Sequence, residues 1–267
     1  MQCRGAIPIE QQRQPFENSM NKTLLIASMA LALAACGGGG GDDDGPAPQP
    51  ATSPAEGLYT GKTSANQDIA GLVLDDGTYY VIYTSLAPVS LGVIQGKLSA
   101  ANGNFSSNDG KDFSVTSRGI FDVAINGTYA TKGNLNGTVR YPATGQTATF
   151  TSTYDKNYEL TPSLATLAGT YSGTSVIPEG GESATITVAT SGTISGAGAS
   201  GCRIEGAAKP RARGNAYDIT VTFGPSPCAR PGQKMSGVAY YSAEDRSLIA
   251  TGTTSDRSAG VLFVGTR

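Results

Sequence analysis

Residues Tyr217–Phe223 have the sequence Tyr-Asp-Ile-Thr-Val-Thr-Phe, in which apolar and polar side chains alternate. Successive side chains of a β-strand point to opposite faces, so this alternation predicts a strand with one buried and one solvated face. Residues Ala184–Val188 alternate in the same way, and Thr78–Thr84 form a denser apolar stretch that also predicts a strand. We therefore expect an all-β protein.

Turn-forming residues separate the expected strands at short intervals, which is typical of an antiparallel meander. The expected turns are Asp75–Gly77, Asn102–Gly103, Asn108–Gly110, Lys132–Asn134, Glu179–Gly181 and Gly214–Asn215. A helical turn is expected only near Ser163–Leu167. Abundant Thr, Tyr, Val and Gly, with 15% charged residues and no Trp, also favour strands over helices.

Two sequence echoes predict two related units. Gly57–Gly61 (Gly-Leu-Tyr-Thr-Gly) returns as Gly169–Gly173 (Gly-Thr-Tyr-Ser-Gly), and Leu135–Tyr141 is echoed by Met235–Tyr241. We place the units at residues 56–160 and 165–267, while chance similarity between glycine-rich strands stays an alternative.

Each unit is long enough for about eight strands with their turns. An eight-stranded sheet can close on itself and so remove its exposed edges. The predicted fold is therefore two small antiparallel up-and-down β-barrels of about eight strands each, and a two-sheet sandwich is the alternative. A single membrane-spanning barrel is disfavoured, because the expected strands are short and rich in Thr.

The N-terminal part has the pattern of an export signal. Lys22 precedes the apolar run Leu24–Ala35, which is shorter than the roughly 20 residues that span a bilayer. Leu33-Ala34-Ala35-Cys36 resembles the bacterial lipobox, which implies diacylglycerol attachment at Cys36. We expect a non-native extension at 1–19, a signal peptide at 20–35, and the lipidated cysteine with a disordered Gly/Asp/Pro linker at 36–55.

Two cysteines remain for the folded part, Cys202 and Cys228, and export predicts that they form a disulfide. A metal site at this pair is disfavoured, because the chain has no His and no further cysteine pair nearby. We expect no metal and no cofactor.

The sequence argues against catalysis. Without His there is no Ser-His-Asp or Cys-His arrangement, and there is no Gly-x-Ser-x-Gly elbow. A glycosidase with two distant carboxylates stays an alternative. The stretch Gly57–Thr63 lacks one residue of the phosphate-loop pattern and precedes no expected helix, so we expect no nucleotide ligand.

Basic residues of the second unit form a candidate partner-binding patch around the expected disulfide. They are Arg203, Lys209, Arg211, Arg213, Arg230 and Lys234. Such a patch could bind an acidic partner, and solvated loop charges are the alternative. The formal net charge of −2 makes nucleic acid an unexpected partner.

The lipobox, the glycine-rich tether and the glycine- and threonine-rich strands together resemble bacterial surface lipoproteins of the transferrin-binding protein B and factor-H-binding-protein type. This resemblance implies a non-catalytic binding protein at the outer membrane, attached through its N-terminal lipid and binding an unknown protein or glycan. Delivery to the outer membrane is favoured because Gly37 and Gly38 follow Cys36, and the long tether favours exposure at the cell surface. A periplasm-facing inhibitor of a lysozyme or protease, and a structural envelope component, are the alternatives.

Overall fold

The computed structural model describes residues 53–86 and 89–267, which belong to one compact unit of the chain. The predicted signal peptide, the lipidation site Cys36 and nearly all of the predicted linker lie outside the described residues. Within the described part, no helix is long and apolar enough to cross a membrane.

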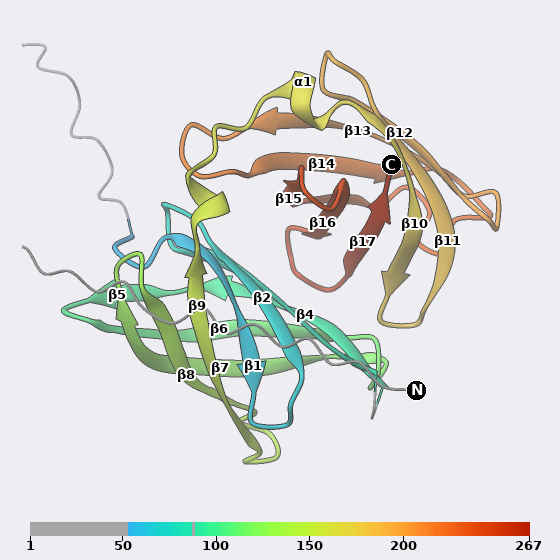
Figure 1. Ribbon diagram of the computed structural model, residues 1–267. Coiled ribbons are helices and arrows are strands. Elements are labelled where there is room, and N and C mark those ends of the chain that lie inside the picture. The colour runs from blue at the N-terminus through green and yellow to red at the C-terminus, as the bar shows by residue number, and fades with distance from the viewer. Residues whose placement is uncertain (1–52, 87–88) are drawn as a thin grey trace, which may run out of the picture. The chain divides into compact units, whose positions relative to one another are not determined.

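The first sheet contains nine antiparallel strands in the spatial order β4-β3-β2-β1-β9-β8-β7-β6-β5. Strand β1 pairs with both β2 and β9. Pairing of β4 with β6 closes eight of the strands into a barrel, and the short β5 pairs with β6 beside the closure. Figure 1 shows this barrel in blue to green. Its strands are β1 (Gly57–Thr63), β2 (Asp68–Val73), β3 (Thr78–Leu86), β4 (Val89–Lys97), β5 (Ser99–Ala101), β6 (Asn104–Ser114), β7 (Gly119–Ala130), β8 (Asn134–Arg140) and β9 (Thr147–Asp155).

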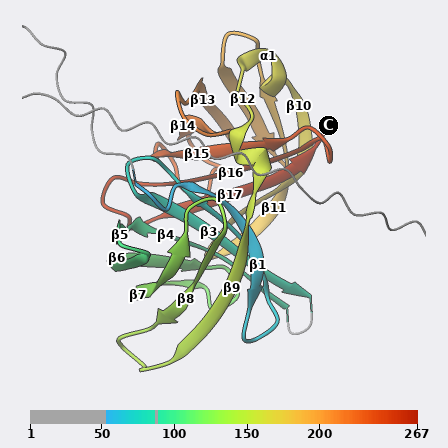
Figure 2. The same ribbon diagram turned by 60° about the vertical axis from the view of Figure 1, so that its left-hand side comes forward.

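The second sheet is a closed eight-stranded barrel in strict chain order. It follows a short 3-10 helix, η1 (Lys156–Glu159), and one helical turn, α1 (Leu164–Leu167), where the sequence predicts a helical turn. Figure 2 shows this meander in yellow to red. Its strands are β10 (Gly169–Ile177), β11 (Gly180–Val188), β12 (Thr193–Gly198), β13 (Arg203–Pro210), β14 (Tyr217–Phe223), β15 (Lys234–Ser242), β16 (Ser247–Thr253) and β17 (Gly260–Thr266). The predicted fold class is confirmed.

The Gly-x-Tyr-x-Gly echo marks equivalent positions, because it lies in the first strand of each barrel. Tyr59 and Tyr171 are both fully buried, and each donates its hydroxyl proton to a backbone carbonyl four residues earlier, at Ala55 and Leu167. A buried phenol needs such a partner, since an unpaired hydroxyl loses its hydration without compensation. The echoed tyrosine therefore fixes how the chain enters each barrel.

The second echo does not mark equivalent strands. Leu135–Tyr141 covers β8, which pairs with the last strand of its barrel, whereas Met235–Tyr241 lies in β15, one strand earlier in the order. The cross-strand pairs Gly127–Gly137 and Gly237–Gly252 give the reason. In each barrel, two neighbouring strands carry glycines that face each other, so both strands of such a pair have a similar glycine-rich sequence. The echo therefore matches β8, the second strand of its pair, with β15, the first strand of the other pair.

One predicted turn is wrong. Asn108-Asp109-Gly110 lies inside β6, where the pairing with β7 shifts between Ser107 and Gly110 as a β-bulge. A bulge inserts an extra residue without ending the strand, and it reverses which later side chains face inward. The bulge therefore decides which residues of β6 enter the first barrel.

Candidate functional site

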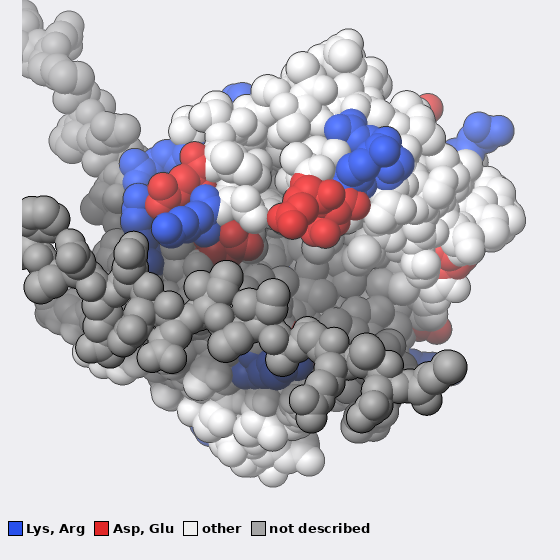
Figure 3. All heavy atoms as spheres, viewed as in Figure 1, with Lys and Arg blue, Asp and Glu red and all other residues white. Residues whose placement is uncertain are grey.

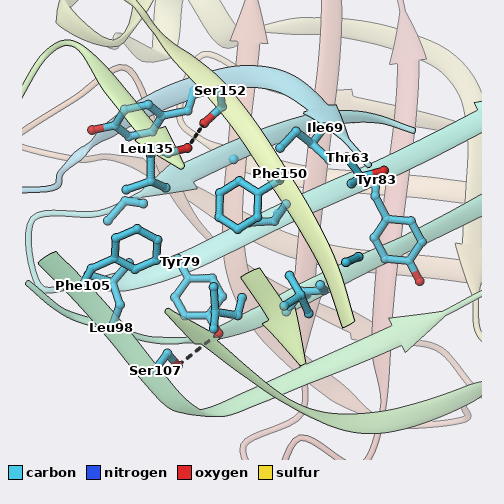
Figure 4. Close-up of a pocket in the computed structure, with 18 of the residues that line it drawn as sticks. Thr63, Ile69, Tyr79, Tyr83, Leu98, Phe105, Ser107, Leu135, Phe150 and Ser152 are labelled. Carbon is cyan, nitrogen blue, oxygen red and sulfur yellow. Dashed lines mark hydrogen bonds between the residues drawn. The ribbon is translucent and has the colours of Figure 1, made fainter. Parts of the chain in front are cut away.

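The first barrel encloses a cavity of about 100 Å³, which we call the first-barrel cavity. Its walls come from the inward-facing side chains of all eight barrel strands and from residues flanking them. Six aromatic rings contribute to the lining: Tyr59, Tyr79, Tyr83, Phe105, Tyr141 and Phe150. In Figure 4, Phe150 lies between Tyr79 and Phe105 on one side and Thr63 and Tyr83 on the other. The arrangement suits an apolar or aromatic occupant.

The two ends of this cavity differ in exposure. One end is lined by Tyr59, Tyr79, Leu98, Phe105 and Leu135, each at most 7% exposed.

At the other end lie four half-buried residues: Thr63, Gln67, Tyr83 and Tyr141. Thr63 ends β1, Gln67 precedes β2, Tyr83 lies in the second half of β3, and Tyr141 follows β8. We call these four residues the mouth. A closed apolar end and a more polar, accessible end are the features of a binding pocket rather than of a filled core.

A buried carboxylate stands behind the mouth. Asp112 is 2% exposed and accepts hydrogen bonds from the Tyr83 hydroxyl at 2.9 Å and the Tyr141 hydroxyl at 2.8 Å. Burial raises the pKa of Asp112 to about 6, although both tyrosine hydrogen bonds oppose the shift. The pKa values of Tyr83 and Tyr141 are also raised, first by burial and then by the negative charge of Asp112.

Asp112 has no cationic partner. Neither the ion pairs nor the hydrogen bonds found over residues 53–86 and 89–267 join it to a Lys or Arg, and the adjacent Lys111 pairs with Asp122. Asp112 is not itself part of the cavity wall. Its chemical effect is therefore indirect, because it holds both tyrosine hydroxyls in fixed orientations.

Two further hydrogen bonds made by hydroxyl groups lie in the deeper part of the cavity. Tyr79 and Ser107 share a hydrogen bond of 3.1 Å, and Ser152 donates to the backbone oxygen of Leu135 (Figure 4). Burial raises the pKa of Tyr79 to about 12. These hydroxyls are satisfied within the protein, so the deep part of the cavity behaves as an apolar surface.

Sequence reasoning misses this site because of the bulge in β6. Strict alternation from Phe105 places Asp112 on the outer face, and only the extra residue near Asn108–Gly110 turns it inward. The same three residues produce the mistaken turn prediction. An Asn-Asp-Gly cluster within a run of strand residues is the signal that could have found the site, since glycine inside a strand often marks a bulge.

The second barrel has a smaller interior space of about 60 Å³. Its lining is mostly aliphatic, with Phe223 and Phe263 as the aromatic members. At one end Arg267 lies over the Tyr241 ring, 4.5 Å from its centroid, and donates to the Ala168 and Thr166 carbonyls. This barrel therefore offers less room and a more obstructed end than the first.

The predicted disulfide joins Cys202 and Cys228, whose Cα atoms are 4.4 Å apart. It connects the start of β13 to the loop after β14.

The six basic residues of the predicted patch are divided between the two ends of β13. Arg203 begins this strand beside Cys202, whereas Arg211 and Arg213 follow its far end. Arg211 forms ion pairs with Asp75 and Asp218.

Half of the patch is neutralised. Arg213 pairs with Glu56, and Arg230 pairs with Glu179. Arg203, Lys209 and Lys234 are exposed. On the face drawn in Figure 3, basic and acidic side chains lie together in small mixed groups. A partner for these residues stays a prediction.

Among the residues that the structure describes, no group of three or more His, Cys, Asp or Glu could hold a metal ion. Gly57–Thr63 forms β1 and continues into a turn rather than a helix, so it lacks the helix N-terminus of a phosphate loop.

No family model and no curated protein matches this chain. Among solved structures, it is similar to a Bacteroides fragilis protein described as an outer membrane protein, with 14% identity and a TM-score of 0.26 over 81% of this chain and 100% of that one. It is also similar to isotype 1 transferrin binding protein B from serogroup B Neisseria meningitidis, with 10% identity and a TM-score of 0.29 over 73% of this chain and 66% of that one. Similarity this low establishes neither a family nor a function.

Proposed function

We propose that this chain is a lipid-anchored protein of the bacterial outer membrane that acts by binding, not by catalysis, and that the first barrel is its binding module. The first-barrel cavity is the observation that supports binding. It is closed by buried side chains at one end and bordered by half-buried polar side chains at the other.

The chemistry of the cavity supports binding over catalysis. The mouth contains hydroxyl and amide groups and no charged side chain, and the nearest buried carboxylate, Asp112, is held behind Tyr83 and Tyr141. A general acid or base must reach the reacting atom within hydrogen-bond distance, and the two tyrosines block Asp112 from doing so.

The anchoring part of the proposal rests on Leu33-Ala34-Ala35-Cys36. It is tested by expressing the full chain and its Cys36→Ala variant in a Gram-negative host and separating membranes from soluble fractions. We expect the full chain in the membrane fraction and the variant in the soluble periplasmic fraction or unprocessed. Equal membrane attachment of both forms would contradict lipid anchoring at Cys36.

The orientation is tested on the same cells with an added protease and an intact periplasmic marker as control. Rapid loss of the protein is expected if the barrels face outward. Full protection until the outer membrane is breached would contradict surface exposure and favour the periplasmic inhibitor instead.

The binding part is tested by native mass spectrometry of protein released from membranes in mild detergent. We expect a population heavier than the lipidated chain by a discrete small-molecule mass, and its loss in Gly71→Val. Gly71 lines the cavity, and a Cβ added there would lie 3.5 Å from the nearest atom, which is ordinary contact. Identical ligand-free spectra for both proteins would contradict binding inside the barrel.

A further inference from the structure

The mouth of the first-barrel cavity contains three hydroxyl oxygens and the side-chain amide of Gln67, whose nitrogen donates to Ser90 at 2.8 Å. Tyr83 and Tyr141 donate their hydroxyl protons to Asp112. Thr63 donates its hydroxyl proton to the Gln67 side-chain oxygen at 3.1 Å. The Thr63 oxygen already accepts the backbone N–H of Gln67 at 3.2 Å, and Ser114 hydrogen-bonds to Tyr83. Among the described residues, the Tyr141 hydroxyl oxygen has no donor of its own, so it can accept a hydrogen bond from a ligand.

The negative charge of Asp112 behind the mouth also favours a ligand that donates a hydrogen bond. Among the residues that the structure describes, Asp112 has no cationic partner, and the adjacent Lys111 is engaged with Asp122. An unpaired carboxylate in a low-dielectric surrounding repels an anion and favours a neutral donor.

The walls favour an aromatic ring over a flexible alkyl chain. Six rings line the first-barrel cavity, against two in the second barrel. Aromatic pairs gain from offset and edge-to-face contacts beyond simple burial. The volume of about 100 Å³ is somewhat below that of an apolar cavity of about 150 Å³ that holds benzene. A single ring therefore has to extend partly into the mouth, where its substituent lies.

We propose that the first-barrel cavity takes a monocyclic aromatic molecule whose substituent donates a hydrogen bond, with the ring beside Phe150 and the donor facing the mouth. This inference rests on the proposed function, because it names the ligand class of the same cavity. Asp112 is a positioning residue in this site, since it orients Tyr83 and Tyr141 without touching the ligand.

The test uses four probes: phenol, toluene, benzoate and hexan-1-ol. They are titrated at pH 7.5 into the mature chain carrying Cys36→Ser, with binding followed by methyl NMR. The reporters are Ile69, Ile94 and Ile125, which line the first-barrel cavity, and Ile186 and Ile219 of the second barrel are the internal reference. We expect phenol to shift the first set and to bind about tenfold more tightly than benzoate, with toluene between them.

Matched variants separate cavity binding from surface binding. Gly71→Val and Ala148→Val each place methyl groups in the cavity, and either should abolish the phenol shifts. Having two such variants keeps the test open if one fails to fold. Ala124→Val adds the same groups beside the inward-facing Val123 and Ile125, on the outer side of β7, and should leave binding unchanged.

Asp112→Asn tests the effect of the negative charge behind the mouth, because asparagine can still bond with Tyr83 and Tyr141. It should reduce the preference for phenol over benzoate several-fold, because that charge is gone. A merely structural role would weaken both probes equally and leave that ratio unchanged, which would contradict an effect of the charge on ligand choice.

The outcomes are distinct. Binding of hexan-1-ol without binding of the aromatic probes would overturn the ligand class and leave the proposed function standing. Phenol shifts that persist in both cavity-filling variants would overturn the site. If no probe shifts the first-barrel methyl groups, the inference fails, and the native mass spectra of wild type and Gly71→Val decide the proposed function independently.

Discussion

The buried carboxylate of Asp112 should destabilise the fold as the pH rises. Its pKa is about 6 in the folded protein against an ordinary value of 3.8, so the folded state binds this proton more tightly than the unfolded state. At 1.36 kcal/mol for each tenfold change in proton affinity, the ionised form costs about 3 kcal/mol at neutral pH.

The pH window follows from these two values. Well below pH 3.8 Asp112 is protonated in both states and the cost is small. Stability is lost between pH 4 and pH 6, where the unfolded chain ionises while the folded one keeps its proton, and the full cost stays above pH 6.

Asp112→Asn removes the titration and keeps a side chain that can still bond with Tyr83 and Tyr141. The quantity to compare is the unfolding free energy of the variant minus that of wild type. We therefore expect this difference to be about 2.5 kcal/mol larger at pH 7.5 than at pH 4. Urea unfolding at both pH values measures this difference, and any pH-independent packing effect of the substitution cancels.

The exposed Asp122 supplies the control. Asp122→Asn should change the same difference by no more than about 0.5 kcal/mol. A difference for Asp112→Asn that is flat from pH 4 to pH 7.5, or that falls, would refute the conclusion that an uncompensated carboxylate is buried behind the mouth.

The remaining stability predictions concern the disulfide of the second barrel and the entry of the chain into that barrel. Replacing both Cys202 and Cys228 by Ser opens a loop with a sequence separation of 26 and should lower the unfolding free energy by about 3.5 kcal/mol; an unchanged urea midpoint would contradict this. Tyr171→Phe removes the buried hydroxyl that bonds Leu167 and should cost about 1 to 2 kcal/mol, measured by urea unfolding. A loss below 0.3 kcal/mol, which is roughly the scatter of such measurements, would show that this bond does not fix the entry into the barrel.

Sequence alternation was enough to predict the barrel architecture, because each barrel strand has one face toward an apolar interior. Tyr217–Phe223 shows this clearly, with Tyr217, Ile219, Val221 and Phe223 buried and the intervening residues more exposed. Five of the six predicted turns lie between strands that pair with each other, and glycine at positive φ stands at three of them, at Gly77, Gly103 and Gly214.

The candidate site was not predictable in the same way. Asp112 faces inward only because the bulge at Ser107–Gly110 shifts the alternation of β6 by one residue. Its partners Tyr83 and Tyr141 come from strands far apart in the sequence, and only the closing of the barrel brings them together. The basic residues show the opposite case, since neighbours in sequence are divided between the two ends of β13.

The first barrel keeps an accessible space inside a closed sheet, and crystals of the mature chain with Cys36→Ser, pressurised with xenon, test this most directly. Xenon binds in apolar cavities of about 150 Å³, and because it is a single atom it can also enter the smaller first-barrel cavity of about 100 Å³. We predict an anomalous peak beside Phe150 within the first barrel, and none there in Gly71→Val. An empty first barrel in the pressurised wild-type crystal would contradict it.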